Sequence, residues 1–308
     1  MSGESSSALM GAKRAIDGVL LLDKPVNMSS AQAIARVKRL LRCEKIGHAG
    51  TLDPDASGLL VCLLGRATRL ASHAEAGTKV YSGSVQLGIT TTTDDVSGDV
   101  IESRPVRAAP DEIAAAALRF TGEILQVPPQ VSALKVAGER AYNIARAGLT
   151  AELKARPVTV ERLVVSNIGP DTFDFVCTCS KGTYIRSLAR DIGAALGCGG
   201  ALKSLRREAS RPFTVEQARG LDGGLEAGIL PWFELFPSIR TVELPFADGE
   251  RVWNGDLGAL RRIPPPPNGE LRAVYRVRGE APSGLLEWTP EGWRIVVNVT
   301  APGKAGDI

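Results

Sequence analysis

The sequence of 308 residues contains no apolar run of the roughly 18 residues that are needed to span a bilayer. Its longest apolar stretches, at 18–22 and 59–64, have the length of core strands. Residues 1–15 are mostly small and polar and lack the apolar stretch of a secretory signal. We therefore expect a disordered leader over 1–15 and a cytoplasmic protein that does not enter a membrane.

Cysteine and histidine are scarce, with five and two residues. An odd, scattered set of cysteines forms no disulfide framework, which fits a reducing compartment. Cys177 and Cys179 stand in a CxC spacing, but the chain has no His/Cys quartet of the kind that binds zinc. Strand alternation places both cysteines on the same face as Phe173 and Phe175, which predicts a buried core and no metal.

Excess charge is also small, because the formal net charge is only +3. Composition alone therefore does not indicate a nucleic-acid partner. Two local clusters of basic residues are more informative, since such clusters bind phosphate backbones, although each alone is also typical of a solvated helix face. The clusters are Arg36, Lys38, Arg39, Arg42 and Lys45, and Lys203, Arg206, Arg207 and Arg211.

Hydrophobic periodicity predicts strands and helices in irregular order, without βαβ alternation. This order favours an α+β fold with a mixed, largely antiparallel central sheet. A large domain is expected over 16–238, with an insertion at about 127–157, followed by a small β-rich domain over 239–308. The predicted strands are 17–23, 79–87, 158–165 and 172–179; the predicted helices follow Ser29–Ser30 and cover 111–121, about 139–147 and 184–196; residues 47–58 are expected to form a turn-rich loop.

The loop at 47–58 contains Asp53 followed by Pro54, which restrains the backbone of the aspartate. An Asp-Pro pair is usually only a turn, and His48 in the same loop would by itself be an ordinary loop histidine. Arg186 is more unusual. If Thr183 caps the following helix, Arg186 lies in the first turn, where the helix dipole disfavours a cation. An anion such as the Asp53 carboxylate would compensate, and the alternative is a solvated arginine.

Several motifs resemble those of the TruB family of tRNA uridine-55 pseudouridine synthases. The resemblance covers most of 16–215, and the segments GTLDPDASG and KGTYIRSLARD are its most specific parts. The motifs are GVLLLDKPVNMSS (18–30), KIGHAGTLDPDASGLL (45–60), KVYSGSVQLG (79–88), TDDVSGD (93–99), CSKGTYIRSLARDIG (179–193) and LKSLRREASRPF (202–213); VPPQVSALKVAGERAYNIARAG (127–148) is similar to the RNA-clasping insertion.

The resemblance implies a role for individual positions. Asp53 matches the catalytic aspartate, and Arg186 matches the residue that pairs with its carboxylate. The remaining substrate-binding roles are base stacking by Tyr81, pocket lining by Tyr184 and Leu205, occupation of the space of the extruded nucleotide by His48, and a basic contact to the substrate by Arg69. Lys203, Arg206 and Arg207 are expected to contact the RNA backbone.

The same resemblance implies isomerisation of uridine-55 in the T-stem-loop of tRNA to pseudouridine, without a cofactor. It also implies a monomer without an obligate protein partner, and a PUA-like RNA-binding domain over 239–308. Three alternatives remain open: a guide-RNA-dependent relative similar to dyskerin and Cbf5, an RNA chaperone for tRNA folding, and a glycosidase. A glycosidase would need two carboxylates about 5–10 Å apart, for which Asp53 and Asp55 form the only tempting pair.

Overall fold

The computed structural model describes residues 13–132, 134–136, 139–140, 144, 149, 151–266, 270 and 272–303. Most of the predicted leader and most of the helix predicted at 139–147 lie outside these residues. Glu139–Arg140 forms strand β9, which pairs with β8 (Lys135–Val136). The predicted helix is therefore wrong at its first two residues, which lie in a paired strand instead.

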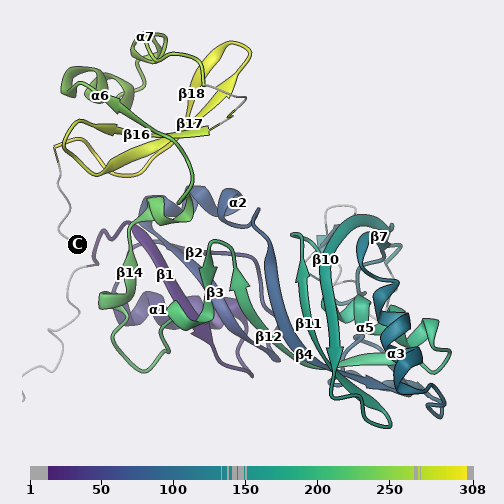
Figure 1. Cartoon of the computed structure of the whole chain (residues 1–308). Coiled ribbons are helices and arrows are strands. Elements are labelled where there is room, and N and C mark those ends of the chain that lie inside the picture. Colours follow the sequence, from purple (N-terminus) through teal and green to yellow (C-terminus); the bar gives the residue numbers. More distant parts are fainter. Residues whose placement is uncertain are drawn as a thin grey trace, which may run out of the picture.

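A ten-stranded sheet runs through the main part of the chain (Figure 1). Only β3 and β12 pair in parallel, and the other strand pairs of this sheet are antiparallel, which confirms the predicted α+β class with a mixed, largely antiparallel sheet. The path is β14 (Ile229–Leu230), β1 (Gly18–Lys24), β3 (Ala56–Leu64), β12 (Gly200–Ser210), β4 (Lys79–Leu87), β11 (Thr172–Cys179), β10 (Arg156–Ser166) and β7 (Gly122–Gln126), with β2 (Ile46–Ala49) beside β3 and β13 (Phe213–Thr214) beside β12.

The half of the sheet that contains β1 and β3 is covered on both faces, which explains why these strands are almost continuously apolar. Leu20 and Leu22 pack with helix α1 (Ser30–Leu41), whereas Val19 and Leu21 belong to a core on the opposite face. Ser29 caps α1 through the backbone amide of Gln32, as the Ser-Ser sequence predicts.

The other half of the sheet buries one face. Phe173, Phe175, Cys177 and Cys179 alternate inward from β11, as predicted, and pack with helices α5 (Ile185–Ala195) and α3 (Pro110–Leu118). On the opposite face of β10 and β11, valine side chains are exposed. The period of two in these strands therefore follows from a sheet that is covered on one side.

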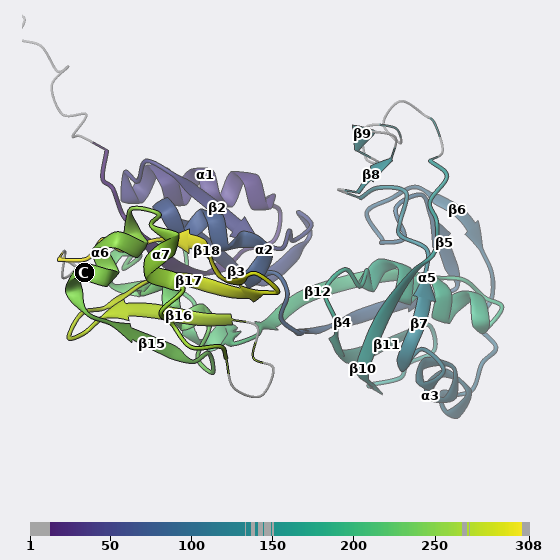
Figure 2. The same ribbon diagram turned by 90° about the horizontal axis from the view of Figure 1, so that it is seen from above.

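A smaller β-rich unit follows the main sheet and lies next to its β1 and β3 half (Figures 1 and 2). Val274, Leu285 and Val297 from this unit share a core with Val19 and Leu21. Its sheet has the order β15 (Thr241–Leu244), β16 (Arg272–Val277), β17 (Pro282–Thr289) and β18 (Gly292–Asn298), accompanied by helices α6 (Phe246–Trp253) and α7 (Leu257–Leu260).

The remaining elements are short. None of the helices in the described part of the chain is long and apolar enough to cross a membrane. The remaining elements are the 3-10 helices η1 (Gly65–Leu70), η2 (Val215–Gln217), η3 (Glu226–Gly228) and η4 (Trp232–Leu235), helix α2 (Ala71–Ala74), and the paired strands β5 (Ile89–Thr91) and β6 (Val100–Ser103).

Candidate active site

The loop that carries Asp53 is shorter than predicted, because residues at both ends of 47–58 join strands β2 and β3. Hydrogen bonds hold this loop against the start of α1. The Ser30 hydroxyl accepts from the Leu52 amide and donates to the Leu52 carbonyl, both at 2.9 Å. The Lys24 ammonium donates to the Pro54 carbonyl at 3.3 Å. Asp53 is thus held between two anchored neighbours, and its side chain remains 44 % exposed.

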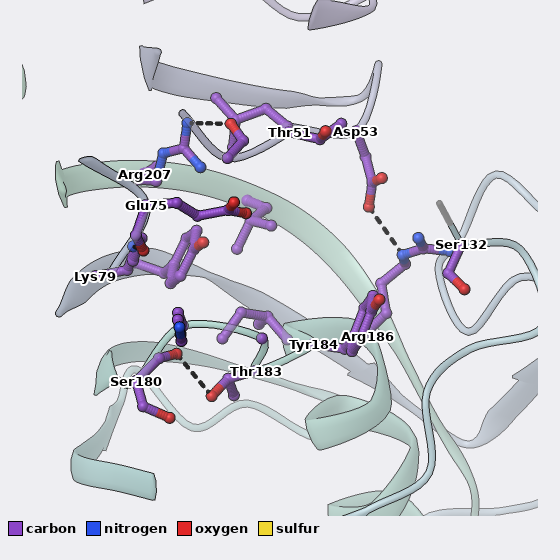
Figure 3. A pocket seen from close by; sticks show the side chains of 17 residues that line it. Thr51, Asp53, Glu75, Lys79, Ser132, Ser180, Thr183, Tyr184, Arg186 and Arg207 are labelled. Carbon is purple, nitrogen blue, oxygen red and sulfur yellow. Dashed lines mark hydrogen bonds and ion pairs between the residues drawn. The ribbon is translucent and has the colours of Figure 1, made fainter. Parts of the chain in front are cut away.

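The Asp53 carboxylate forms an ion pair with Arg186, whose Nε lies 2.9 Å from Oδ2 (Figure 3). This contact confirms the predicted pairing. The residue at the helix start is Tyr184 rather than Thr183, but Arg186 still lies in the first turn of α5. The Arg186 side chain is only 7 % exposed, so a nearby anion is needed to compensate for its burial.

Arg186 also donates hydrogen bonds to two backbone carbonyls. Its two terminal nitrogens donate to the Thr93 carbonyl at 3.0 Å and to the Val131 carbonyl at 2.8 Å. A second carboxylate, Asp95 Oδ2, lies 3.7 Å from the guanidinium. With Nε directed at Asp53, the planar guanidinium fixes the direction of the carboxylate as well as its charge.

Asp95 was not predicted from the sequence. Its Oδ1 accepts hydrogen bonds from the Thr93 hydroxyl at 2.7 Å and from the Ser97 amide and hydroxyl at 3.1 and 2.6 Å. These bonds orient Oδ2 towards Arg186, so Asp95 is a second carboxylate that stabilises the buried guanidinium. The motif TDDVSGD contains the signal, since an aspartate followed two residues later by serine commonly closes such a turn.

A pocket of about 220 Å³ opens next to the ion pair. Tyr81, Tyr184, Leu205 and Arg186 all line it, so the structure brings these predicted substrate-binding residues together with Asp53. The pairing of β12 with both neighbours explains this convergence, because Leu205 lies opposite Ala56 of β3 and Gly83 of β4. Burial raises the pKa of the Tyr81 phenol, so this ring is neutral at ordinary pH.

The end of the pocket away from Asp53 contains charged residues that the sequence did not predict to lie there. The cations Lys79 and Arg207 line this end together with Glu75, and Ser180 and Thr183 lie below them in the view of Figure 3. Burial lowers the pKa of Lys79 to about 8. Its ammonium donates to the carbonyls of Glu75 and Gly77.

Arg207 does not have the exposed position that was predicted for an RNA phosphate contact. It is 1 % exposed, and it donates to the Leu59 carbonyl at 2.6 Å and to the Gly50 carbonyl at 3.1 Å. The reason is strand alternation, because Arg206 and Arg207 are neighbours on β12 and point to opposite faces. Arg207 therefore ties the loop before Asp53 to the centre of the sheet.

The other two predicted backbone contacts differ from each other. Lys203 is exposed and lines a second pocket of about 260 Å³, which shares Asp53 and Arg186 with the first. Arg206 forms a bidentate ion pair with Asp23, at 2.8 and 3.1 Å, and lies 3.5 Å from Glu208. The hydrogen bond to Asp23 raises the pKa of Arg206, and both carboxylates compete with any phosphate.

His48 and Arg69 line neither pocket at Asp53. His48 lies on β2, where burial lowers its pKa and its Nδ1 has no hydrogen-bond partner among the described residues. Arg69 is exposed on η1, which contacts β2. These two predicted residues therefore lie on neighbouring elements outside the pocket.

Two family models match consecutive parts of the chain. The model described as the TruB family pseudouridylate synthase N-terminal domain matches residues 38–185, and the tRNA pseudouridylate synthase B C-terminal domain matches residues 186–223. Proteins named tRNA pseudouridine synthase B are similar along most of the chain. The one from Burkholderia mallei is 50 % identical over 300 residues, covering 93 % of this chain and 99 % of the relative.

The chain belongs to the TruB family. A second TruB relative, from Thermobifida fusca, is 51 % identical over 250 residues, covering 78 % of this chain and 85 % of the relative. The fold agrees. A Cbf5-Nop10-Gar1 complex contains a chain with a TM-score of 0.65 and 25 % identity, covering 92 % of this chain and 84 % of the other. A chain of an archaeal Nop10-Cbf5 complex, with a TM-score of 0.66 and 23 % identity, supports the fold alone.

Proposed function

We propose that this member of the TruB family isomerises uridine-55 in the T-arm loop of tRNA to pseudouridine, with Asp53 as the essential carboxylate. One observation carries the proposal. The half-exposed Asp53 is paired at 2.9 Å with a buried arginine at the edge of a pocket lined by Tyr81, Tyr184 and Leu205. The names of the relatives, which are tRNA pseudouridine synthases, support the choice of tRNA as substrate.

The chemistry begins with extrusion of the target uridine from its stack, because the reacting atoms are inaccessible inside it. The Tyr81 ring then provides a stacking surface, worth about 1–3 kcal/mol. Arg186 pairs with the Asp53 carboxylate and orients it, so that the carboxylate acts as nucleophile or base. The bond between N1 and C1′ breaks, the base turns, and C5 bonds to C1′. Atoms balance without a cofactor, because N1 gains a proton and C5 loses one.

Contacts outside the pocket would hold the T-stem-loop. Lys203 is exposed beside Asp53 and is suited to a phosphate contact. His48 would take the space of the extruded nucleotide, and Arg69 would meet the RNA on the same side, since their elements are neighbours. The insertion at 127–157 would clasp the RNA, and the β-rich unit at 239–308 would act as a PUA-like RNA-binding domain.

The test uses the purified chain and an unmodified tRNA transcript. We expect pseudouridine at position 55 only, mapped by chemical derivatisation and reverse transcription, with the chain acting alone as a monomer. A transcript with cytidine at position 55 is the matched control and should remain unmodified. Pseudouridine at another position would contradict the proposed specificity, and an absence of pseudouridine from every transcript would contradict the activity.

A second candidate is a guide-RNA-dependent enzyme. The similarity to a chain from a Cbf5-Nop10-Gar1 complex favours it, since that protein assembles with partners. The same assay separates the two candidates. Turnover by the purified chain on tRNA alone excludes a requirement for guide and partners, whereas turnover only after addition of a cell extract supports it.

A further inference from the structure

The end of the pocket away from Asp53 contains two buried cations whose hydrogen-bond partners are neutral carbonyls, and Glu75 lines the same end without forming an ion pair with either. Lys79 is 4 % exposed, and its ammonium donates to two neutral carbonyls, one of them Gly77 O at 2.6 Å. Arg207 is likewise held by carbonyls. Within the part of the chain that the structure describes, no carboxylate lies within 4.0 Å of either cation. A negatively charged ligand would therefore be stabilised here.

Among the residues that the structure describes, Lys79 has partners for only two of its three hydrogen-bond donors. An ammonium has three N–H groups, and the carbonyls of Glu75 and Gly77 accept from two of them. Lys79 lines the pocket, two residues before Tyr81 on the same face of β4. A base stacked on Tyr81, with its sugar near Asp53, would thus have its far edge close to Lys79.

Breaking the N1–C1′ bond leaves the bonding electron pair on the uracil ring, where it spreads from N1 to the two carbonyl oxygens. We propose that Lys79 is a further catalytic residue, whose ammonium donates a hydrogen bond to a uracil carbonyl oxygen and stabilises this anion. The inference rests on the proposed function. Lys79 keeps its proton throughout, because the proton that N1 gains is balanced by the one that C5 loses. A preorganised cation in a buried site is well suited to such charge.

Lys24 provides an internal comparison. It is also fully buried, and burial lowers its pKa to about 8 as well. However, its ammonium donates to three carbonyls, those of Pro25, Met28 and Pro54, and it does not line the pocket. Lys24 therefore has no donor left for a ligand, and its hydrogen bonds hold the loop next to Asp53.

The first experiment measures single-turnover cleavage of the N1–C1′ bond in RNA that carries uridine or 5-fluorouridine at the target position. Fluorine at C5 withdraws electrons and stabilises the uracil anion without help from the protein. We expect Lys79→Met to slow the reaction of uridine about 100-fold, as loss of one transition-state donor does. With 5-fluorouridine the deficit should shrink to about 10-fold or less.

Lys24→Met is the matched control, since it also removes a buried ammonium and should slow both substrates by one common factor. If Lys79→Met also slows both substrates by one common factor, its role is structural and the proposal fails. Wild-type protein that does not modify the uridine substrate would instead overturn the proposed function. The two failures are therefore distinguishable.

A second variant keeps the fold intact. The ionisable groups that face Lys79 are Arg207, Glu75, Cys179 and Lys181, and of these Glu75 and Cys179 raise the pKa of Lys79. Because Glu75 is exposed, Glu75→Gln should fold normally. The wild-type rate should fall as pH rises through about 8, where Lys79 loses its proton. Glu75→Gln should move this fall to lower pH, and an unmoved profile would overturn the role of Lys79.

Discussion

Two buried arginines frame the pocket, and they differ in what faces them. Each donates to two backbone carbonyls, Arg186 to those of Thr93 and Val131, and Arg207 to those of Gly50 and Leu59. Among the described residues, Arg186 has carboxylates within 4.0 Å of its guanidinium, whereas Arg207 has none within that distance. The same side chain thus orients a reactive group at one end of the pocket, whereas at the other end it braces the sheet and contributes positive charge.

Removing the anion at the Arg186 end should produce the largest effect. Asp53→Asn keeps the volume of the side chain but loses the ionisable group. We expect pseudouridine formation to fall by at least about 10⁴-fold, the order seen when a reactive member of a catalytic set is removed. Affinity for tRNA, measured by filter binding, should stay within a few-fold, because little contact area changes. Turnover near the wild-type rate would show that Asp53 is not essential.

Changing the shape of the cation at the same end should have a smaller effect. Arg186→Lys keeps the charge but loses the planar guanidinium that binds Asp53 through Nε and two carbonyls through its other nitrogens. We expect the single-turnover rate to fall about 100-fold or more. The affinity for tRNA should remain close to that of the wild type. A variant with unchanged turnover would mean that charge alone suffices.

Replacing Arg207, at the other end of the pocket, should lower the stability of the protein. Arg207→Met leaves the Leu59 and Gly50 carbonyls without their donor, which should lower the free energy of unfolding by about 3 kcal/mol. Its neighbour Arg206 is the matched control, since its ion pair with Asp23 is partly exposed. Arg206→Met should cost less than about 1 kcal/mol. Urea unfolding measures both, and equal losses would contradict the assigned difference in burial.

The smallest effect concerns the salt dependence of RNA binding. If Lys203 contacts one phosphate, Lys203→Ala should reduce the slope of log affinity against log salt by about 0.7–0.9. Arg206→Ala should reduce it less, because Asp23 and Glu208 already neutralise that guanidinium. Titrations at several salt concentrations measure both slopes. A larger change for Arg206 than for Lys203 would reverse the predicted order.

The sequence predicted the Arg186 end of the pocket correctly but not the Arg207 end. Arg186 was found because a cation in the first turn of a helix conflicts with the helix dipole, which indicates a nearby anion. Arg207 was misplaced because β12 carries lysine, serine, arginine and glutamate, which hide its strand period. Without that period, Arg206 and Arg207 looked like one exposed patch. Lys79 was missed because burial of a lysine depends on carbonyls contributed by the neighbouring loop, whose course no local pattern reveals.

The fold class was predictable because the local sequence patterns of several elements are clear. Strands such as β4 and β11 alternate clearly, and the α1 cap is visible in the sequence. The parallel contact between β3 and β12 was not predictable, because it joins segments far apart in the chain and depends on the packing of the whole sheet. Asp95 lies in a turn that the local sequence does indicate. Its role was missed because it depends on a tertiary contact with Arg186, which the turn motif does not reveal.

The parallel pair β3 and β12 also has a consequence for the order of folding. Leu59 and Arg207 are joined by a hydrogen bond although 148 residues separate them. Closing so long a loop is slow, and it requires both strands to be available. During synthesis, β1 and β3 with α1 emerge early, but Leu205 and Arg207 join the pocket only after β12 leaves the ribosome. The hydrogen bond between Arg207 and Leu59 therefore cannot form until the chain has been made beyond Ser210.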